Sequence, residues 1–323
     1  MIGKYGEVKN KLKEKIDRIG DKVLFVAGSF LSAQRFKSTD LKSSAGLGEV
    51  VGDLRAKTLF ITGGSRGIGL EIALRAARDG ANIIIAAKTA EPHAKLKGTI
   101  YTAAAEIEKA GGKALALKLD VRDVDQIEQM TKQAAEHFGG IDILINNASA
   151  IFLEKTPHLS LKQYDLMQQV NVRGTFFASK SCYPYLKKSM NPHILTLSPP
   201  INMNPPWAGD HLGYTLSKYG MSLCVAGLAQ EWHNEGIGVN ALWPHTIIAT
   251  AAIENMPMGD VLCARSRHPK IMADAAYQIL IRNAKTCSGN FFVDDEVLKT
   301  AGIEDFEQYS IKPGAKLQPD LFL

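Results

Sequence analysis

Tyr214 and Lys218 lie four residues apart in the string YTLSK, so a helix would place both side chains on one face. An ammonium beside a phenol stabilises the phenolate and lowers the pKa of the phenol from about 10 towards the working pH. Such a phenol can give a proton to a carbonyl oxygen that is being reduced, or accept one from an alcohol in the reverse reaction. Because this spacing also arises by accident on amphipathic helices, the pair needs an independent signal.

That signal is a glycine-rich turn, TGGSRGIG, about 150 residues upstream. It follows the apolar run 58–62 and opens a helical stretch, which is the strand–turn–helix context of a dinucleotide site. Gly63 allows the tight turn, Gly67 lets the backbone approach a pyrophosphate, and Gly69 lets the helix pack closely on the strand. The free N–H groups at the start of this helix favour an anion. The residues expected to contact the cofactor are Gly63, Gly64, Ser65, Arg66, Gly67, Ile68 and Gly69.

The charges near the expected ribose site favour a phosphorylated dinucleotide. NAD sites usually place an acidic residue at the end of the second strand, where it accepts from the ribose 2′-hydroxyl. Here Lys88 follows the second apolar run, and Arg66 in the turn adds a second cation. Both cations would pair with a 2′-phosphate, so we expect NADP(H) as the cofactor. Asp120, which closes the third run, either accepts from the adenine amino group or caps the helix that follows.

Three further strings stand between these motifs: LDV at 119–121, NNAS at 146–149 and NVRG at 171–174. In order and interval, all five strings together resemble the short-chain dehydrogenase/reductase family, over about residues 57–297. The resemblance implies an oxidoreductase that transfers a hydride between a nicotinamide and a carbonyl or alcohol.

The same resemblance implies roles for single residues. Tyr214 would be the catalytic acid/base, and Lys218 would bind the nicotinamide ribose and lower the pKa of Tyr214. Asn171 would hold a water for proton relay, and Asn147 would lie beside the cofactor. Ile247 would present its backbone to the nicotinamide amide, although the family's usual Pro-Gly turn before it is Pro-His here. His245 in that turn is expected at the surface or the lip of the pocket rather than in catalysis.

The expected catalytic serine departs from the family's pattern. It usually lies thirteen residues before the tyrosine, and Ile201 occupies that position here. Ser198 is the nearest candidate, and with a short insertion the aligned residue would be Pro199. Ser198 could reach the substrate carbonyl or could merely end its strand. If it merely ends the strand, one of two substrate-polarising donors is missing, and a non-catalytic dinucleotide-binding regulator or scaffold becomes the alternative function.

The segment after this strand is expected to overhang the active site. Its apolar residues favour a lipid-like substrate, such as a fatty-acyl or steroid-like carbonyl, although such residues also serve as packing; they are Ile201, Met203, Pro205, Pro206 and Trp207. Met256 and Met258 are expected in a mobile lid. The ending 311–323 and other longer strings resemble a narrower group of the family, in which a sterol-carrier domain normally follows. Since the chain stops at Leu323, we expect no such lipid-carrier module.

Short apolar runs alternate with helical stretches from Lys57 onward. The runs expected as strands are 58–62, 81–87, 113–120, 141–146, 193–198, 237–243 and 290–294. Strands that are apolar on both faces and separated by helices form a parallel sheet covered on both sides. Right-handed crossovers then predict an α/β fold, a doubly wound parallel (Rossmann) sheet in three α/β/α layers. We expect this single domain over 56–300, an N-terminal extension and linker over 1–55, and a C-terminal tail over 301–323.

The composition is that of an ordinary globular protein, with 323 residues, 46% hydrophobic and 22% charged, and a net charge of +5. It excludes collagenous, low-complexity and wholly disordered chains. Basic residues are spread along the chain rather than clustered with stacking aromatics, so no nucleic-acid partner is expected. No apolar run approaches the roughly 18 residues that a membrane-spanning helix requires.

The four cysteines are widely scattered and show neither metal-ligand nor CxxC spacing. They predict no metal site, and reduced thiols in an intracellular, reducing compartment. Cytoplasmic, mitochondrial and peroxisomal locations all stay open. The charged stretch 4–22 fits a surface arm, a targeting presequence or a misassigned start. The family resemblance implies homo-oligomers, dimers or tetramers, through the helices that carry Asn171 and Tyr214.

Overall fold

Seven parallel strands form the sheet in the computed structural model, which describes residues 47–92, 98–203 and 206–323. Their order across the sheet is β3–β2–β1–β4–β5–β6–β7. The strands are β1 (Thr58–Thr62), β2 (Asn82–Ala87), β3 (Lys113–Lys118), β4 (Ile143–Asn146), β5 (His193–Thr196), β6 (Gly238–Trp243) and β7 (Phe291–Val293). The chain order reverses between β1 and β4, so the doubly wound topology expected from the sequence is confirmed.

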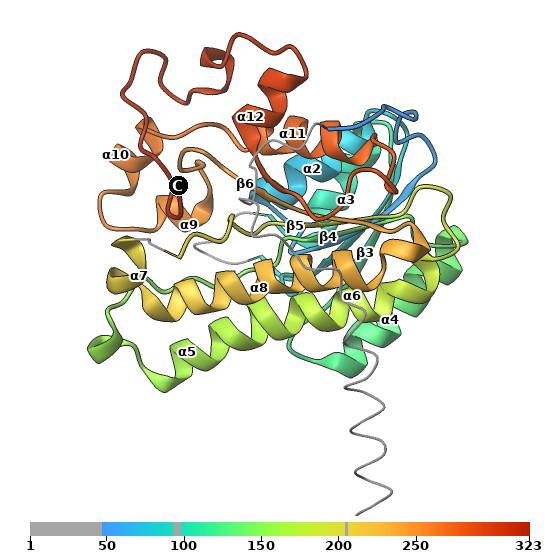
Figure 1. Ribbon diagram of the computed structural model, residues 1–323, viewed down its shortest axis with the longest axis horizontal. Helices are drawn as coiled ribbons and strands as arrows, with labels where there is room; N and C mark the ends of the chain where they lie inside the picture. Colours follow the sequence, from blue (N-terminus) through green and yellow to red (C-terminus); the bar gives the residue numbers. More distant parts are fainter. Residues whose placement is uncertain (1–46, 93–97, 204–205) are drawn as a thin grey trace, which may run out of the picture. The chain divides into compact units, whose positions relative to one another are not determined.

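Helices cover both faces of this sheet, which makes three layers (Figure 1). One face carries α2 (Gly67–Ala77), α3 (Ile100–Lys109), α11 (Lys270–Leu280) and α12 (Asp294–Thr300). The other carries α4 (Val124–Phe138), α5 (Leu161–Met167), α6 (Gly174–Leu186) and α8 (Leu212–Glu231). Three short helices, α7 (Pro206–Asp210), α9 (Ala251–Glu254) and α10 (Gly259–Ala264), lie in the connections beyond the strand ends.

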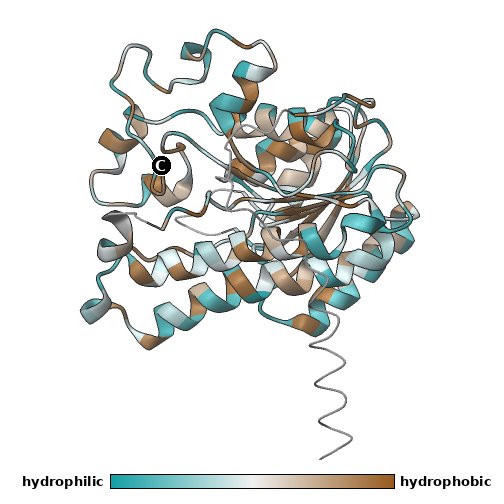
Figure 2. Cartoon of the chain, viewed as in Figure 1, coloured by the Kyte–Doolittle hydropathy of each residue, from teal (hydrophilic) through white to brown (hydrophobic). Residues whose placement is uncertain are grey.

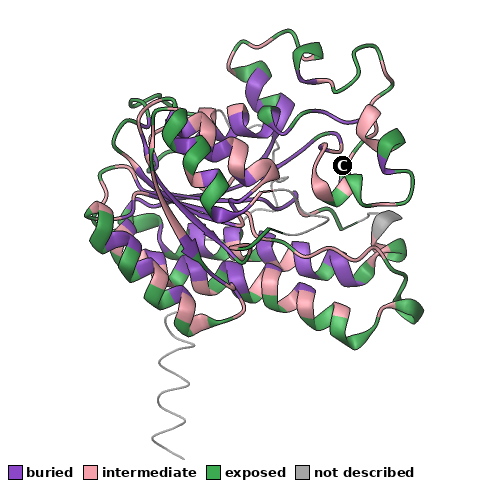
Figure 3. Ribbon diagram, turned by 180° about the vertical axis from the view of Figure 1, so that it is seen from behind, coloured by how far each residue is buried: buried purple, intermediate pink, exposed green. Residues whose placement is uncertain are grey.

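The strands are apolar on both faces because each face is buried under helices. Along β1, Leu59 and Ile61 belong to the core on the α2 side, whereas Phe60 belongs to the core on the α4 side. This alternation follows the two-residue period of a strand. Figure 2 shows hydrophobic residues gathered along the strands. Figure 3, a view from behind, shows that the residues of the strands are mostly buried.

The stretch 159–189 is broken in the structure rather than continuous. It comprises α5, a π-helical segment (Gln168–Arg173) and α6. A π-helical turn places one extra residue in the helix and is frequent at functional sites. Asn171, which was expected in the active site, lies in this turn.

Both predicted flanking segments contribute to the folded unit where the structure describes them. Leu47 and Leu54, from the predicted extension, are buried in the core, and Val51 donates a backbone hydrogen bond to Ile281. The charged stretch 4–22 lies outside the described residues. In the predicted C-terminal tail, Tyr309 and Phe322 are buried.

Several expectations concern features of the whole chain. Among the described residues, none of the helices is both long and apolar enough to cross a membrane. No group of three potential metal ligands occurs in the part of the chain that the structure describes. All four cysteines are free thiols, and the compartment stays a prediction.

Candidate active site

Two adjoining cavities lie at the carboxyl ends of the strands. The larger, about 910 Å³, is lined by the glycine turn, the ends of β2 and β3, and the segment after β4. The smaller, about 420 Å³, is lined by α8, the segment after β6 and the C-terminal residues. Asn147 and Ser149 line both cavities, so the two lie side by side. In doubly wound sheets, ligands bind at this edge, where the strand order reverses.

The glycine turn has the conformation that a pyrophosphate site requires. Gly63 and Gly67 have φ values of 68° and 57°, in the left-handed region that favours glycine. A Cβ atom on Gly63 would lie 2.9 Å from the Cα atom of Ala148, so the turn tolerates no side chain there. The turn residues lining the larger cavity are Gly63, Ser65, Arg66, Gly67 and Ile68, whereas Gly64 and Gly69 do not line it.

Asn147 holds this turn in place. Its Nδ2 atom donates to the carbonyl oxygens of Thr62, at 2.9 Å, and Gly63, at 3.0 Å. Gly69 makes room for that amide, because a Cβ atom at Gly69 would lie 2.5 Å from Nδ2. Asn147 therefore lines the larger cavity, and Gly69 is its packing partner.

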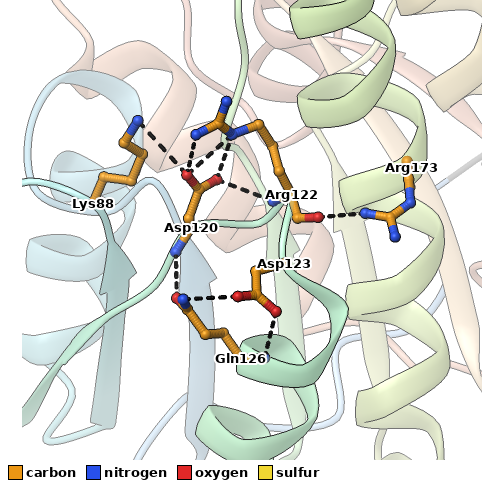
Figure 4. Close-up of polar contacts among 6 residues, drawn as sticks. All are labelled: Lys88, Asp120, Arg122, Asp123, Gln126 and Arg173. Carbon is orange, nitrogen blue, oxygen red and sulfur yellow. Dashed lines mark hydrogen bonds and ion pairs between the residues drawn. The ribbon is translucent and has the colours of Figure 1, made fainter.

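Charged side chains gather at the ends of β2 and β3 (Figure 4). Lys88 Nζ lies 3.7 Å from Asp120 Oδ2. Arg122 contacts both carboxylate oxygens of Asp120, with its Nη2 atom at 2.5 Å from Oδ2. These hydrogen bonds from Arg122 hold the pKa of Asp120 below its usual range. Arg66 donates to the carbonyl oxygen of Gly98 at 2.8 Å.

The alternative that Asp120 caps the following helix is wrong. The N-cap of α4 is Asp123, whose side chain accepts from the backbone of Gln126. Arg122 was missed from the sequence, although it directly follows LDV. Its carbonyl oxygen accepts from Arg173, which links this cluster to the π-helical turn.

Tyr214 and Lys218 lie on the first turns of α8, and both line the smaller cavity. They are 5% and 3% exposed, and Lys218 Nζ donates to the carbonyl oxygen of Leu197 at 2.8 Å. Burial lowers the pKa of Lys218 to about 7. Burial also raises the pKa of Tyr214, and the charge of Asp320 adds to that shift. The direction is opposite to the one expected from Lys218 alone, because the phenol is enclosed by apolar walls.

Asn171 connects the segment after β4 to α8. Its Oδ1 atom accepts from the N–H of Ala150 at 2.7 Å, and its Nδ2 atom donates to the carbonyl oxygen of the same residue at 2.9 Å. Nδ2 also donates to Ser217, whose hydroxyl donates to the carbonyl oxygen of Tyr214. Asn171 is fully buried and does not line the cavities, so these bonds position the residues around Tyr214.

Ser198 was expected near the substrate carbonyl, and the backbone of Ile247 was expected to face the nicotinamide amide. Ser198 is 0% exposed, is not among the cavity-lining residues, and its hydroxyl has no hydrogen-bond partner among the described residues. Ile247 lines the smaller cavity, but its N–H donates to Gln318 and its carbonyl oxygen accepts from Arg267. His245 is exposed, and its ring contacts Asp295 at 2.9 Å rather than the cavity.

None of the described side chains of the loop that was expected to overhang the site contributes to the apolar lining. Ile201 packs against the core, Met203 is exposed, Pro205 lies outside the described residues, and the side chains of Pro206 and Trp207 are not described. Met256 lines the smaller cavity, whereas Met258 is exposed. The other aliphatic side chains of the lining include Ile151, Leu153, Ile253, Leu262 and Leu321.

Two groups in the cavity were missed from the sequence. Ser149 lines both cavities. It is the last residue of the motif NNAS, so that motif could have indicated its place in the site. Gln318 to Leu321 line the smaller cavity, although nothing in the local pattern indicated that the tail returns to the strand ends.

Comparison with known proteins identifies the family. The profile described as short chain dehydrogenase matches residues 57–258. Hydroxysteroid dehydrogenase-like protein 2 from Xenopus laevis is 57% identical over 272 residues, 84% of this chain and 64% of that protein. This chain thus spans about 64% of the length of that relative.

Solved structures agree with this result. A putative dehydrogenase from Xanthomonas campestris is 54% identical, with a TM-score of 0.79 over 84% of this chain and 98% of that one. A short-chain dehydrogenase from Burkholderia cenocepacia J2315, solved in complex with NADP, is 26% identical with a TM-score of 0.65, over 75% of this chain and 97% of that one. The family resemblance seen in the sequence motifs is confirmed, and the chain belongs to the short-chain dehydrogenase/reductase family.

Proposed function

We propose that this protein is an NADP(H)-dependent oxidoreductase that transfers a hydride to or from an apolar carbonyl or alcohol, with Tyr214 as the general acid/base. One observation carries the proposal: Tyr214 and Lys218 line an apolar cavity of about 420 Å³ that adjoins the groove of the glycine turn and shares lining residues with it. A proton donor and the candidate dinucleotide groove therefore lie next to each other.

The described residues fit a phosphorylated dinucleotide. The turn at Gly63 and Gly67 leaves room for a pyrophosphate, and the N–H groups at the start of α2 favour an anion. Lys88 lines the groove and is solvent-exposed, so its ammonium can reach a 2′-phosphate. Support also comes from the Burkholderia relative, whose structure contains NADP. When bound, the nicotinamide supplies or accepts the hydride.

The protein's own groups then manage the proton and the substrate. In reduction, the Tyr214 hydroxyl gives its proton to the substrate oxygen as negative charge develops there. Lys218 as an ammonium would stabilise the phenolate that results. Asn171 holds the segment after β4 and, through Ser217, the backbone of Tyr214. The aliphatic lining excludes water and favours a fatty-acyl or steroid-like substrate, consistent with the name of the Xenopus relative.

The test compares wild type with Tyr214→Phe on a panel of acyl-CoA, retinoid and steroid carbonyls, following NADPH absorbance. We expect turnover to fall about 10³-fold or more in the variant, because the proton donor is lost, while the Kd for NADPH changes little. Tyr183→Phe is the matched control. Tyr183 lies on α6, its hydroxyl donates to Glu235, and neither residue lines the cavity. Equal turnover in both variants contradicts the mechanism. Tight NADPH binding without turnover of any carbonyl would instead favour the regulator or scaffold.

We also propose that the protein is a homo-oligomer. Exposed apolar side chains lie on α6 and α8, the helices expected in the interface: Phe176, Leu212, Leu216 and Leu223. A mass measured by light scattering tests this directly, and a monomer mass at micromolar concentration would contradict it.

A further inference from the structure

The C-terminal residues 318–322 form a strap along the smaller cavity. Four hydrogen bonds fasten it to the last residue of β6, to the segment after β6 and to Arg265. They are Gln318 N–H to Arg265 O (2.9 Å), Ile247 N–H to Gln318 O (3.0 Å), Asp320 N–H to His245 O (3.0 Å) and Trp243 Nε1 to Leu321 O (2.8 Å). The strap is therefore a wall of the cavity and not a loose end.

Phe322 anchors the strap beside Tyr214. Its ring is 1% exposed and lies 5.9 Å from the ring of Tyr214, 5.6 Å from Tyr219 and 5.5 Å from Trp243, between centroids. Its φ of 76° is unfavourable for a residue with a side chain. Such a conformation persists where the surrounding packing over-determines it. The aromatic cluster thus fixes the position of the residue two before it.

That preceding position is Asp320, whose side chain lines the cavity with Tyr214 and Lys218. One carboxyl oxygen accepts from the N–H of Leu321 at 2.7 Å. The ionisable groups whose charges act on it are Lys218 on α8 and Asp294 at the start of α12. All three residues line the same cavity, and the charge of Asp320 acts on both Tyr214 and Lys218. Burial is the main cause that raises the pKa of Asp320 to about 7.

A second donor to the substrate oxygen would further stabilise the negative charge that develops there in the proposed reduction. Ser198, the candidate donor from the sequence, does not line the smaller cavity. The described lining side chains with polar atoms are Asn147, Ser149, Tyr214, Lys218, Trp243, Thr250, Gln318 and Asp320. Asn147, Lys218 and Trp243 already donate to backbone carbonyls. Of the others, Asp320 is the ionisable group beside Tyr214, and its backbone bond to His245 holds it in the same cavity as Tyr214 and Lys218.

We propose that Asp320 is a further catalytic residue, which in its neutral form donates a hydrogen bond to the substrate oxygen beside Tyr214. The proposal rests on the function proposed above. During reduction the transferred proton still comes from Tyr214, and Asp320 keeps its own proton while sharing the developing negative charge. A neutral carboxylic acid in an apolar site is a known donor of this kind, whereas a carboxylate would repel that charge.

The experiment measures kcat/KM for NADPH-dependent reduction against pH, with four variants. Asp320→Ala removes the donor and should lower kcat/KM about 10²-fold near pH 6, with the Kd for NADPH unchanged. Asp320→Asn keeps an N–H donor at every pH and should stay within about 10-fold of wild type. Ser149→Ala tests the other hydroxyl at the junction, and Glu304→Gln is the control for an exposed acid outside the cavity lining.

The pH profile separates Asp320 from Lys218. In wild type the donor is present below pH about 7 and lost above it, so kcat/KM should fall as pH rises through that value. Lys218 titrates in the same range and is still present in Asp320→Asn, so the decisive result is that the fall in Asp320→Asn is smaller than in wild type.

Three results would overturn the proposal: an unchanged fall in Asp320→Asn, an Asp320→Ala loss no larger than that of Glu304→Gln, or a loss that follows Ser149→Ala instead. If turnover survives Tyr214→Phe, the proposed function fails. If turnover depends on Tyr214 but not on Asp320, only the present proposal fails.

Discussion

Replacing Lys88 by alanine should weaken the binding of NADPH and leave that of NADH nearly unchanged. Lys88 Nζ lies 3.7 Å from Asp120, but both oxygens of that carboxylate are already hydrogen-bonded by Arg122. Lys88 can therefore exchange Asp120 for a 2′-phosphate without leaving the carboxylate unpaired. NADH lacks this phosphate, so its binding does not use the exchange.

The size of the effect follows from the exposure of the ammonium. The Lys88 side chain is 65% exposed, so its interactions are strongly screened by water. Two unit charges 4 Å apart interact by about 1 kcal/mol in water, and a phosphate carries nearly two charges. Allowing for the side-chain entropy that pairing removes, we expect a net loss of about 1.5 kcal/mol, or roughly a 10-fold increase in Kd.

The assay is fluorescence titration of NADPH and NADH at low ionic strength, repeated in salt. Lys118→Ala is the matched control, since this exposed lysine ends β3, where it is in register with Ala87 of β2. The difference between the two lysine variants should shrink as salt screens the ammonium, over a Debye length of about 10 Å at 0.1 M. Equal losses for both cofactors in Lys88→Ala, or wild type binding NADH more tightly than NADPH, would refute the reasoning about the 2′-phosphate.

Two further predictions concern stability. Gly69→Ala would drive a Cβ atom against the Asn147 amide and break its two hydrogen bonds to the turn, so denaturant unfolding should show a loss of about 2–3 kcal/mol. Gly227→Ala on α8 meets open space and should be neutral or slightly stabilising, and equal stability of the two variants would contradict the packing argument. His193 is fully buried, and burial lowers its pKa to about 4, below its unfolded value of about 6.5. Its unfolded form therefore takes up a proton first, and stability should fall by roughly 3 kcal/mol as pH drops from about 6.5 to 4. His193→Gln should flatten that part of the pH dependence, and an identical slope in both proteins would speak against it.

The fold was predictable because its signals are local. Apolar runs of strand length, helical stretches and glycine turns each depend on residues near one another in sequence. In β1 the run TLFIT is apolar on both faces, and the structure buries both faces. The break at Gln168–Arg173 was harder to foresee, because a π-helical turn has no clear signature in the apolar pattern.

The relative positions of two site residues could be predicted from the sequence where both lie on one helix or strand, and not where they lie on different ones. Tyr214 and Lys218 share a helix face, so their spacing was sufficient to place them together. Ser198 was expected near the substrate from its distance to Tyr214 along the chain, yet its side chain lies outside the cavity lining. The tie between Asn171 and Ala150 joins two elements and could not be derived from either segment alone.

The amino-acid sequence by itself determined the parallel sheet, the glycine turn and the Tyr–Lys pair, since each is encoded by periodicity or by the conformational freedom of single residues. Tertiary structure alone decided which polar groups enter the cavity. Asp320 comes within electrostatic reach of Tyr214 across more than a hundred residues because the strap bonds to the segment after β6 and Phe322 packs into the aromatic cluster. Such contacts depend on how distant surfaces fit together, and no local pattern of residues specifies them.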